Sequence, residues 1–262
     1  MGLSTHAAAL DIPIPGAKAD RRPRMGRLTA VELRKMVDTR AGFWLQLLVV
    51  ALTVAIVVVV CIVGDAKDQT LRELLSAALA PSSILLPIVG ILLVSSEWSQ
   101  RTAPITFVLV PNRARVLGAK VAASVALSLV AFVFCLAVAA IATAITAPGV
   151  EHTWSLPAGL LGQSLLSLAT GMIGGVAFGA ALLSSAPAIV LSFALPIALG
   201  ALGSIPALEG AARWLDGGRS LTPLTEHLMS STEWARAGTT LALWMVLPLV
   251  IGLWRILRNE VA

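Results

Sequence analysis

The sequence has few charged residues and long stretches that contain none. Only 13% of its 262 residues are Asp, Glu, Lys or Arg, about half the share of an ordinary soluble domain. The longest charge-free stretch, between Glu151 and Glu209, contains 57 residues, and four others contain between 18 and 30. A helix needs about 20 apolar residues to cross the hydrocarbon core of a bilayer. The scarcity of charge therefore excludes an ordinary soluble protein and predicts one embedded in a membrane.

These stretches predict six transmembrane helices. The 57-residue stretch is long enough for two spans, and the turn-forming segment SSAPA (Ser184–Ala188) divides it. The predicted fold class is an all-α integral membrane protein, with a flexible tail over residues 1–27 and one six-span domain over residues 28–262. The spans are expected at about 43–64, 76–97, 117–146, 157–182, 186–204 and 239–257.

The positions of the basic residues predict which ends of the spans face the cytoplasm. Fourteen of the 19 Lys and Arg residues lie before the first span, between spans two and three, or after the last span. Because basic loops stay on the cytoplasmic side, both termini are expected in the cytoplasm. The net charge of +5 is thus explained by basic residues that set the orientation of the protein in the membrane. Nucleic-acid binding is not expected, because the bases occupy short flanks rather than one folded face.

The chain lacks the residues that most catalytic and energy-coupling sites require. It contains no G-x-x-x-x-G-K-[S/T] phosphate-binding loop, so no nucleotide site of that kind is expected. Its three histidines and two cysteines are scattered, which predicts no metal site. The predicted spans carry almost no ionisable residues, on which proton- or sodium-driven carriers depend. Such a protein conducts passively or receives work from a partner, and it is not expected to be an enzyme or to bind a cofactor itself.

Two regions outside the spans are expected to be helical. Before span one, LTAVELRKMVDTR (Leu28–Arg40) has an apolar face and the capping-box pattern of Thr29 and Glu32. This predicts an amphipathic helix at the lipid surface, either a simple anchor or a contact for a partner. Between spans five and six, PALEGAARWL (Pro206–Leu215) and Leu224–Trp234 predict two short helices that cap the outer face.

Span four carries three glycines on one helical face, at Gly171, Gly175 and Gly179. Small residues at every fourth position let two helix backbones approach closely in lipid. The spacing predicts a helix-packing face. Packing within one subunit is the favoured interpretation, and contact between subunits is the alternative.

The loop between spans two and three combines charge with apolar surface. Glu97 ends span two, and an apolar run that includes Phe107 and Leu109 lies between Arg101 and Arg113. A short apolar helix with basic edges can insert into a groove on a soluble protein. The pattern therefore predicts a docking element, and Glu97 is expected to pair with Arg101 if the helix continues for another turn.

The segment SEWSQRTAPITFVLVPNRARVLGAK resembles the membrane subunit of ABC-2-type ABC transporters, specifically the small actinobacterial permeases. The matching residues are Glu97, Trp98, Thr102, Pro111, Arg113 and Lys120. VELRKMVDTRAGFWL (Val31–Leu45) is similar to the connecting helix that enters span one in that family. The six-span layout, with an outer helical insertion before the last span, is similar over the whole chain.

The resemblance implies the permease of an ATP-driven exporter in the bacterial plasma membrane, active in multidrug resistance or a related export. Two copies of a separate ABC ATP-binding subunit would hold ATP and Mg²⁺ and dock on a cytoplasmic coupling helix over residues 99–112. The docking residues would be Glu97, Trp98, Arg101, Thr102, Phe107, Leu109, Pro111 and Arg113.

A second permease copy, identical or a sibling, would enclose the translocation path with this one. The few fixed charges in the spans favour an amphipathic substrate, such as a drug, a peptide antibiotic or a lipid. The alternative function is a membrane scaffold or sensor subunit that docks a cytoplasmic partner and transports nothing.

Overall fold

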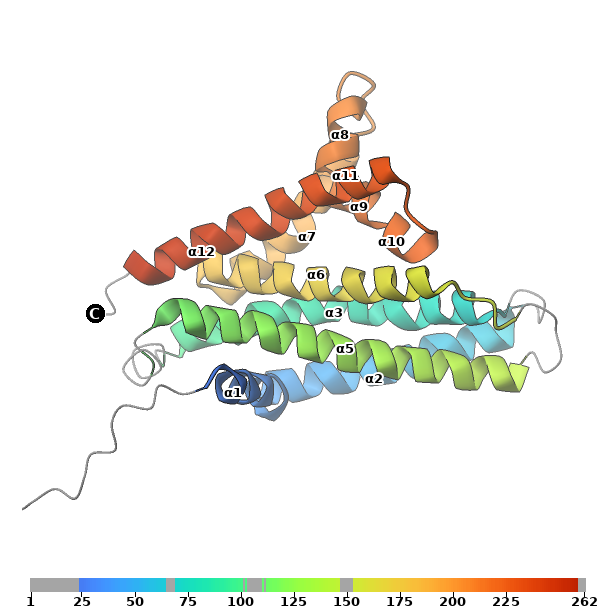
Figure 1. The fold of residues 1–262 in the computed structure, drawn as a ribbon, viewed down its shortest axis with the longest axis horizontal. Helices are drawn as coiled ribbons and strands as arrows, with labels where there is room; N and C mark the ends of the chain where they lie inside the picture. Colours follow the sequence, from blue (N-terminus) through green and yellow to red (C-terminus); the bar gives the residue numbers. More distant parts are fainter. Residues whose placement is uncertain are drawn as a thin grey trace, which may run out of the picture.

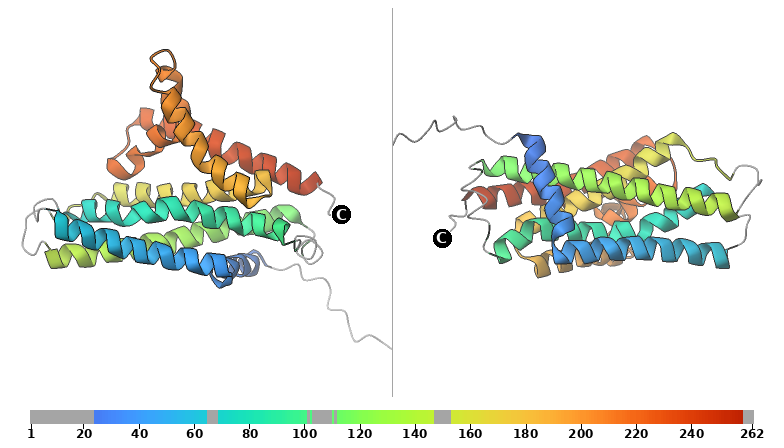
Figure 2. Two further views of the ribbon diagram at one scale, coloured as in Figure 1. Left: turned by 180° about the vertical axis from the view of Figure 1, so that it is seen from behind. Right: turned by 90° about the horizontal axis from the view of Figure 1, so that it is seen from below.

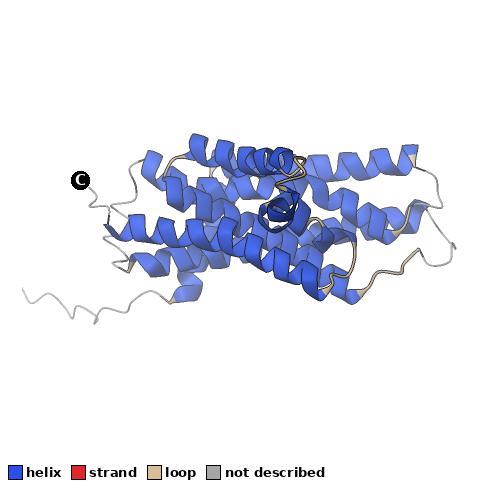
Figure 3. Ribbon diagram, turned by 90° about the horizontal axis from the view of Figure 1, so that it is seen from above, coloured by secondary structure: helices blue, strands red, loops and turns tan. Residues whose placement is uncertain are grey.

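A computed structural model gives the arrangement of the spans. It describes residues 24–64, 69–100, 102, 110, 112–146 and 153–258. Over these residues the chain forms helices and no strand (Figure 3), and six of the helices are long and apolar enough to cross a membrane. The prediction of an all-helical protein with six membrane-crossing helices is therefore confirmed.

The described helices follow one another along the chain in numerical order. Their bounds are α1 (Met25–Asp38), α2 (Arg40–Val63), α3 (Leu71–Ser99), α5 (Arg113–Thr146), α6 (Ala158–Leu182), α7 (Ser185–Leu202), α8 (Glu209–Leu215), α9 (Gly217–Leu221), α10 (Pro223–Glu226) and α11 (Ser231–Leu241). A π-helical turn, η1 (Ala242–Val246), joins α11 to α12 (Leu247–Arg258). The six spans are α2, α3, α5, α6, α7 and the continuous unit of α11, η1 and α12.

A sharp elbow separates α1 from α2. Thr39 has an extended backbone, and its hydroxyl oxygen accepts a hydrogen bond from the Gly42 N–H at 3.1 Å, which caps α2. A β-carbon at Gly42 would lie 2.1 Å from the Met36 carbonyl oxygen, so only glycine fits there. The elbow turns α1 across the end of the bundle, where it packs against α5 (Figure 2, right).

The N-terminus of α1 lies one turn earlier than its sequence predicts. The helix begins at Met25, and the Thr29 hydroxyl donates to the Met25 carbonyl oxygen at 3.1 Å from within the helix. The carboxylate of Glu32 binds two lysine ammonium groups instead of a backbone N–H. The predicted capping box is wrong, because two charged donors bind a carboxylate more strongly than one amide does.

The last span also begins earlier than predicted, at Ser231 rather than at about 239. A capping box starts it: the Glu233 N–H donates to the Ser230 hydroxyl oxygen, and the Ser230 N–H donates to the Glu233 carboxylate. The segment Leu224–Trp234 is therefore not one short helix. It is divided between α10, which ends at Glu226, and the first turn of α11.

The 57-residue charge-free stretch is divided between α6 and α7, near the predicted break. Leu183 has a left-handed backbone, with φ of 55°, and Ser184 is extended. The next helix begins at Ser185, so Pro187 falls in its first turn, where the missing N–H has no intrahelical acceptor. From this turn α7 runs obliquely away from the bundle (Figure 2, left).

Helix α3 lies at the centre of the fold, between α2, α5 and α6 (Figure 1). Over half of its most apolar stretch is buried by these neighbours. Helix α12 packs along α6, and a β-carbon at Gly252 would lie 2.5 Å from the Ala180 β-carbon. Together α1, the start of α5 and the end of α12 bring most of the basic residues that the structure describes to one end of the bundle, called the basic end below.

Candidate functional site

Glu97 and Lys120 meet inside the basic end of the bundle. Glu97 lies in the last turn of α3, and Lys120 lies in the second turn of α5. Both side chains are buried, and the Lys120 Nζ is 2.8 Å from a Glu97 carboxylate oxygen. The same Nζ donates to the Leu93 carbonyl oxygen at 3.1 Å and to the Glu32 carboxylate at 2.7 Å. An ammonium group has three hydrogens, and all three of them have acceptors here.

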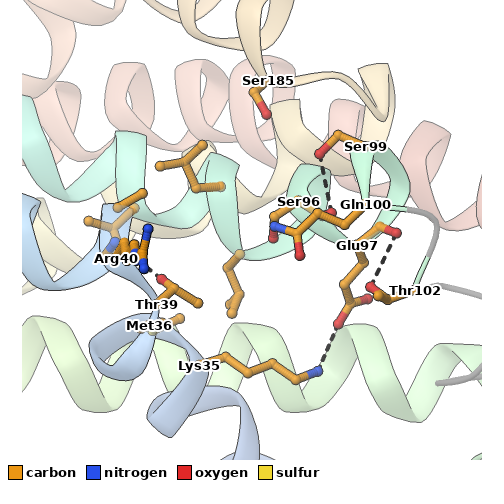
Figure 4. A pocket seen from close by; sticks show the side chains of 15 residues that line it. Lys35, Met36, Thr39, Arg40, Ser96, Glu97, Ser99, Gln100, Thr102 and Ser185 are labelled. Atoms are coloured by element: carbon orange, nitrogen blue, oxygen red, sulfur yellow. Dashed lines mark hydrogen bonds and ion pairs between the residues drawn. The ribbon is translucent and has the colours of Figure 1, made fainter.

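Helix α1 completes the arrangement with one carboxylate and one ammonium group. Glu32 is buried, and Lys35 lies one turn later on the same face of α1. The Lys35 Nζ is 2.8 Å from a Glu32 carboxylate oxygen and 2.8 Å from a Glu97 carboxylate oxygen. Figure 4 shows the contact with Glu97. We call Glu32, Lys35, Glu97 and Lys120 the ionic cluster. Its two negative and two positive charges sum to zero.

The neutrality of the ionic cluster allows these charges to be buried. A single buried ion costs several kcal/mol in lost hydration, and only close partners and hydrogen bonds offset this cost. Burial alone would lower the pKa of Lys35, but the carboxylates of Glu97 and Glu32 outweigh that effect and raise the pKa above its usual value. Removing one member would leave another charge buried without its partner. The cluster therefore fixes α1, α3 and α5 relative to one another.

Glu97 does not depend on the predicted pairing with Arg101, because its carboxylate binds Lys35 and Lys120. Arg101 itself lies outside the described residues. In the sequence Lys120 served only as a match to the family pattern and a charge that sets the topology. The oppositely charged Glu32 and Lys35, three residues apart on a predicted helix, were the signal that could have indicated a partner for a buried charge.

The other predicted docking residues either make contacts within the bundle or lie outside the described residues. The Thr102 N–H donates to the Glu97 carbonyl oxygen at 2.9 Å, which closes the turn at the end of α3. Trp98 is half-buried against the core. The Arg113 guanidinium donates to the Ile256 carbonyl oxygen, which joins the start of α5 to α12. Phe107, Leu109 and Pro111, with most of the predicted coupling helix, lie outside the described residues.

A cavity of about 830 Å³ lies beside the ionic cluster. Its walls come from the α1–α2 elbow, from the last turns of α3 and from the start of α7 (Figure 4). Lys35 and Glu97 line one side of it, Thr39 and Arg40 line another, and Ser185 lies opposite them. The Ser185 and Ser95 hydroxyl oxygens are 2.7 Å apart, so a hydrogen bond holds the start of α7 to α3. The cavity thus gives solvent or a partner access to the partly exposed side of the cluster.

The three glycines of α6 face α3 in the same chain. A β-carbon at Gly175 would lie 2.1 Å from the Pro87 carbonyl oxygen, and one at Gly179 would lie 2.8 Å from that of Ile91. At Gly171 the nearest atom would be the Pro87 Cγ, at 3.7 Å, an ordinary contact. Gly175 and Gly179 therefore permit the close approach of α6 to α3, and the structure places this glycine face within one subunit.

Comparison with models of known protein families and with curated proteins finds no match for this chain. The fold and the site thus define a multi-pass, all-helical membrane protein with a buried ionic cluster at its basic end. Any narrower assignment depends on the residues themselves.

Proposed function

We propose that the chain is the membrane-spanning permease of an ATP-driven exporter of the ABC-2 type, and that it moves an amphipathic substrate. A separate ATP-binding subunit supplies the energy and docks on the segment between α3 and α5. The observation that supports this most is the ionic cluster, because it joins the two helices that flank this segment and attaches α1 to both.

The ionic cluster is suited to transmitting force from a cytoplasmic subunit to the helix bundle. The docking segment begins where α3 ends and stops where α5 begins, so force on it acts on both helix ends. Lys120 binds Glu97 directly and binds Glu32 of α1 at the same time. Because breaking a buried ion pair is costly, α1, the end of α3 and the start of α5 move as one unit. Motion of the ATP-binding subunit therefore reaches the bundle instead of being lost in a flexible loop.

The proposed sidedness follows from charge. The basic end holds residues of the kind that remain in the cytoplasm during insertion. The ATP-binding subunit is soluble and cytoplasmic, so the docking segment and the ionic cluster face it. The opposite end, where α2 ends and α3 begins, is then the outer face. Two copies of the chain, or one copy and a sibling permease, enclose the path, and the protein resides in the bacterial plasma membrane.

The test uses the chain co-expressed with an ATP-binding cassette protein chosen as its candidate partner. Phe107→Asp with Leu109→Asp is expected to abolish co-purification, because charge removes the apolar surface that enters the partner's groove. The matched control is Ile205→Asp with Leu208→Asp, two exposed apolar residues just before α8 and outside the basic end. Loss of the partner from the control alone, or from neither variant, would contradict the proposed docking segment.

A scaffold or sensor that binds the same partner is the second candidate, and Glu97→Ala separates the two. In a permease this change leaves the partner bound but uncouples it, so substrate-stimulated ATP hydrolysis by the reconstituted complex falls. In a scaffold no compound stimulates hydrolysis, with or without the substitution. Full stimulation in Glu97→Ala would remove the role proposed for the ionic cluster.

A further inference from the structure

A second cavity, of about 320 Å³, lies between α3 and α6 of the bundle and the last part of the chain, and it shares no lining residue with the cavity beside the ionic cluster. Helices α3, α6, α7, α9 and α11 and the π-helical turn η1 form its walls. We propose that this cavity binds an uncharged, largely apolar molecule that carries hydrogen-bond donors, such as an alcohol or an amide. The site needs no ATP-binding partner, so this inference goes beyond the proposed function.

The lining of the cavity excludes ions. No Asp, Glu, Lys, Arg or His is among its 18 lining residues, all of which lie in the part of the chain that the structure describes. Phe178, Phe193 and Trp244 supply aromatic walls. A carboxylate or ammonium group placed here would lose its hydration without gaining a partner. The volume is within the range of small-molecule sites, and apolar walls with a few polar groups are typical of them.

The polar groups of the cavity can accept hydrogen bonds more readily than they can donate them. A hydroxyl group has one hydrogen, and once this is donated the oxygen can only accept. Most of the lining hydroxyls have already donated theirs to backbone carbonyl oxygens: Ser83 to Ala80 at 2.7 Å, Thr170 to Leu166 at 2.8 Å, Ser192 to Ile189 at 2.9 Å and Thr240 to Trp214 at 3.1 Å. The Trp244 indole N–H is likewise donated to the Leu215 carbonyl oxygen, at 2.7 Å.

Prolines add backbone acceptors to the same walls. A proline has no N–H, so the carbonyl four residues earlier loses its helical donor. Pro87 and Pro196 lie four residues after Ser83 and Ser192, and both of these earlier residues line the cavity. The π-helical turn of the last span, a feature frequent at functional sites, falls at the same place. A ligand with its own O–H or N–H groups therefore fits, and one without them gains less.

Two neighbouring glycines, Gly174 and Gly175, allow the cavity and the helix packing to be tested independently. A β-carbon at Gly174 would meet no atom within 4 Å, whereas one at Gly175 would collide with the Pro87 backbone. A larger side chain at Gly174 therefore enters the cavity without disturbing the contact between α6 and α3. Gly162, on the same helix, also has open space around it and does not line the cavity.

The experiment uses three photoreactive probes of similar size on the full chain in lipid nanodiscs. The probe 4-(hydroxymethyl)benzophenone carries a donor, 4-(methoxymethyl)benzophenone has that donor blocked, and 4-benzoylbenzoate carries a negative charge. After irradiation, mass spectrometry locates the labelled peptides. The alcohol is expected to label α6 and the α11–α12 unit with about three- to tenfold higher affinity than the methyl ether, the factor that one hydrogen bond contributes. The carboxylate should label these peptides least.

Gly174→Leu is expected to suppress this labelling, and Gly162→Leu is expected to leave it unchanged. If Gly174→Leu does not fold, Ser167→Ala serves instead: loss of that lining hydroxyl should lower labelling by the alcohol and not by the ether. Equal labelling by all three probes, labelling confined to the lipid-facing side of α2, or labelling that Gly174→Leu leaves intact would overturn the proposal. None of these outcomes depends on ATP hydrolysis, so the cavity can fail while the docking proposal survives, and the reverse.

Discussion

Helices α3 and α7 are both apolar enough to cross a membrane, and they are used in different ways. The most apolar stretch of α3 is 56% buried inside the protein, and that of α7 is only 6% buried. Helix α3 holds a close glycine contact with α6 and one carboxylate of the ionic cluster. Helix α7 leaves large apolar residues such as Val190 and Ile197 exposed.

This difference shows that the hydropathy of a helix predicts whether it can lie in a membrane, but not which other helices it packs against. In lipid, apolar side chains gain little by leaving the bilayer, so packing is decided by small residues and by polar contacts. Helix α3 has both, in Gly90 against the Met172 backbone and in Glu97 with its lysines. In α7 the Ser185 hydroxyl reaches α3 at the first turn, and beyond that turn the protein buries little of the helix.

Among substitutions that test this contrast between α3 and α7, Lys120→Met is expected to lower the stability of the protein most. The change leaves Glu32 and Glu97 buried with Lys35 as their one remaining ammonium partner in the cluster. The free energy of unfolding should fall by about 3–5 kcal/mol, the cost of breaking a buried ion pair from one side. Thermal unfolding in detergent measures it. Adding Glu97→Gln should restore part of the loss, because one buried negative charge is then removed.

The control for that variant is Arg34→Met, which removes a basic residue whose side chain is mostly exposed. A change there should stay within about 0.5 kcal/mol. If Lys120→Met costs no more than Arg34→Met, the ionic cluster does not hold α3 to α5.

A smaller loss of stability is expected from Gly175→Ala, which disrupts the contact between α3 and α6. The new β-carbon would overlap the Pro87 carbonyl oxygen, so the helices must separate. Overpacking of this kind costs about 1–3 kcal/mol, again measured by thermal unfolding. Gly174→Ala is the matched control and should change stability little, because its β-carbon meets open space. Equal effects of the two substitutions would contradict the close approach.

The contribution of Lys35 is expected to be smaller and to depend on pH. Its pKa in the folded protein is raised above the ordinary value of 10.5, so its stabilising effect is complete below that pH and is lost as the pH rises through the folded value. Lys35→Met should cost less than about 1 kcal/mol at neutral pH, because water screens this partly exposed side chain. The substitution should also reduce the fall in stability above pH 10.5. An unchanged alkaline profile would show that Lys35 is not paired.

The smallest effect is expected on α7. Ile197 is 73% exposed, so Ile197→Ala should change the stability of the single chain by less than about 0.5 kcal/mol. Unfolding of the detergent-solubilised protein at low concentration measures this. A larger loss would mean that this face of α7 packs against protein, and the contrast with α3 would then be lost.

Much of the fold could be predicted from the sequence because the bilayer imposes it. A charge-free stretch of 20 residues has few alternatives to a membrane-crossing helix, so the number of spans and most of their ends were predictable. The early start of the last span could not be predicted in this way. Its first turns contain the charged residues Glu233 and Arg236, so they do not belong to a charge-free stretch. The glycine face of α6 was predictable as a packing face, although the spacing does not name α3 as its partner.

The ionic cluster could be predicted only in part. Glu97 stood out as a carboxylate at the end of a span, but its partners lie 62 and 23 residues away along the chain. Local rules of helix spacing favour Arg101 over such distant lysines. Burial of Glu32 on a helix that looks amphipathic likewise depends on α1 lying across α5, and that crossing follows from the elbow at Thr39 and Gly42.

The most direct measurement of the central claim is the sidedness of Asn112, an exposed residue just before α5. Asn112→Cys is treated with a membrane-impermeant maleimide in intact and in permeabilised cells, with the unsubstituted chain as background. Glu73→Cys, an exposed position in the first turn of α3 at the end of that helix opposite Glu97, is the control. A cytoplasmic docking segment predicts that Asn112→Cys reacts only after permeabilisation, whereas Glu73→Cys reacts in intact cells. Reaction of Asn112→Cys in intact cells would place the ionic cluster on the outside, out of reach of any ATP-binding subunit.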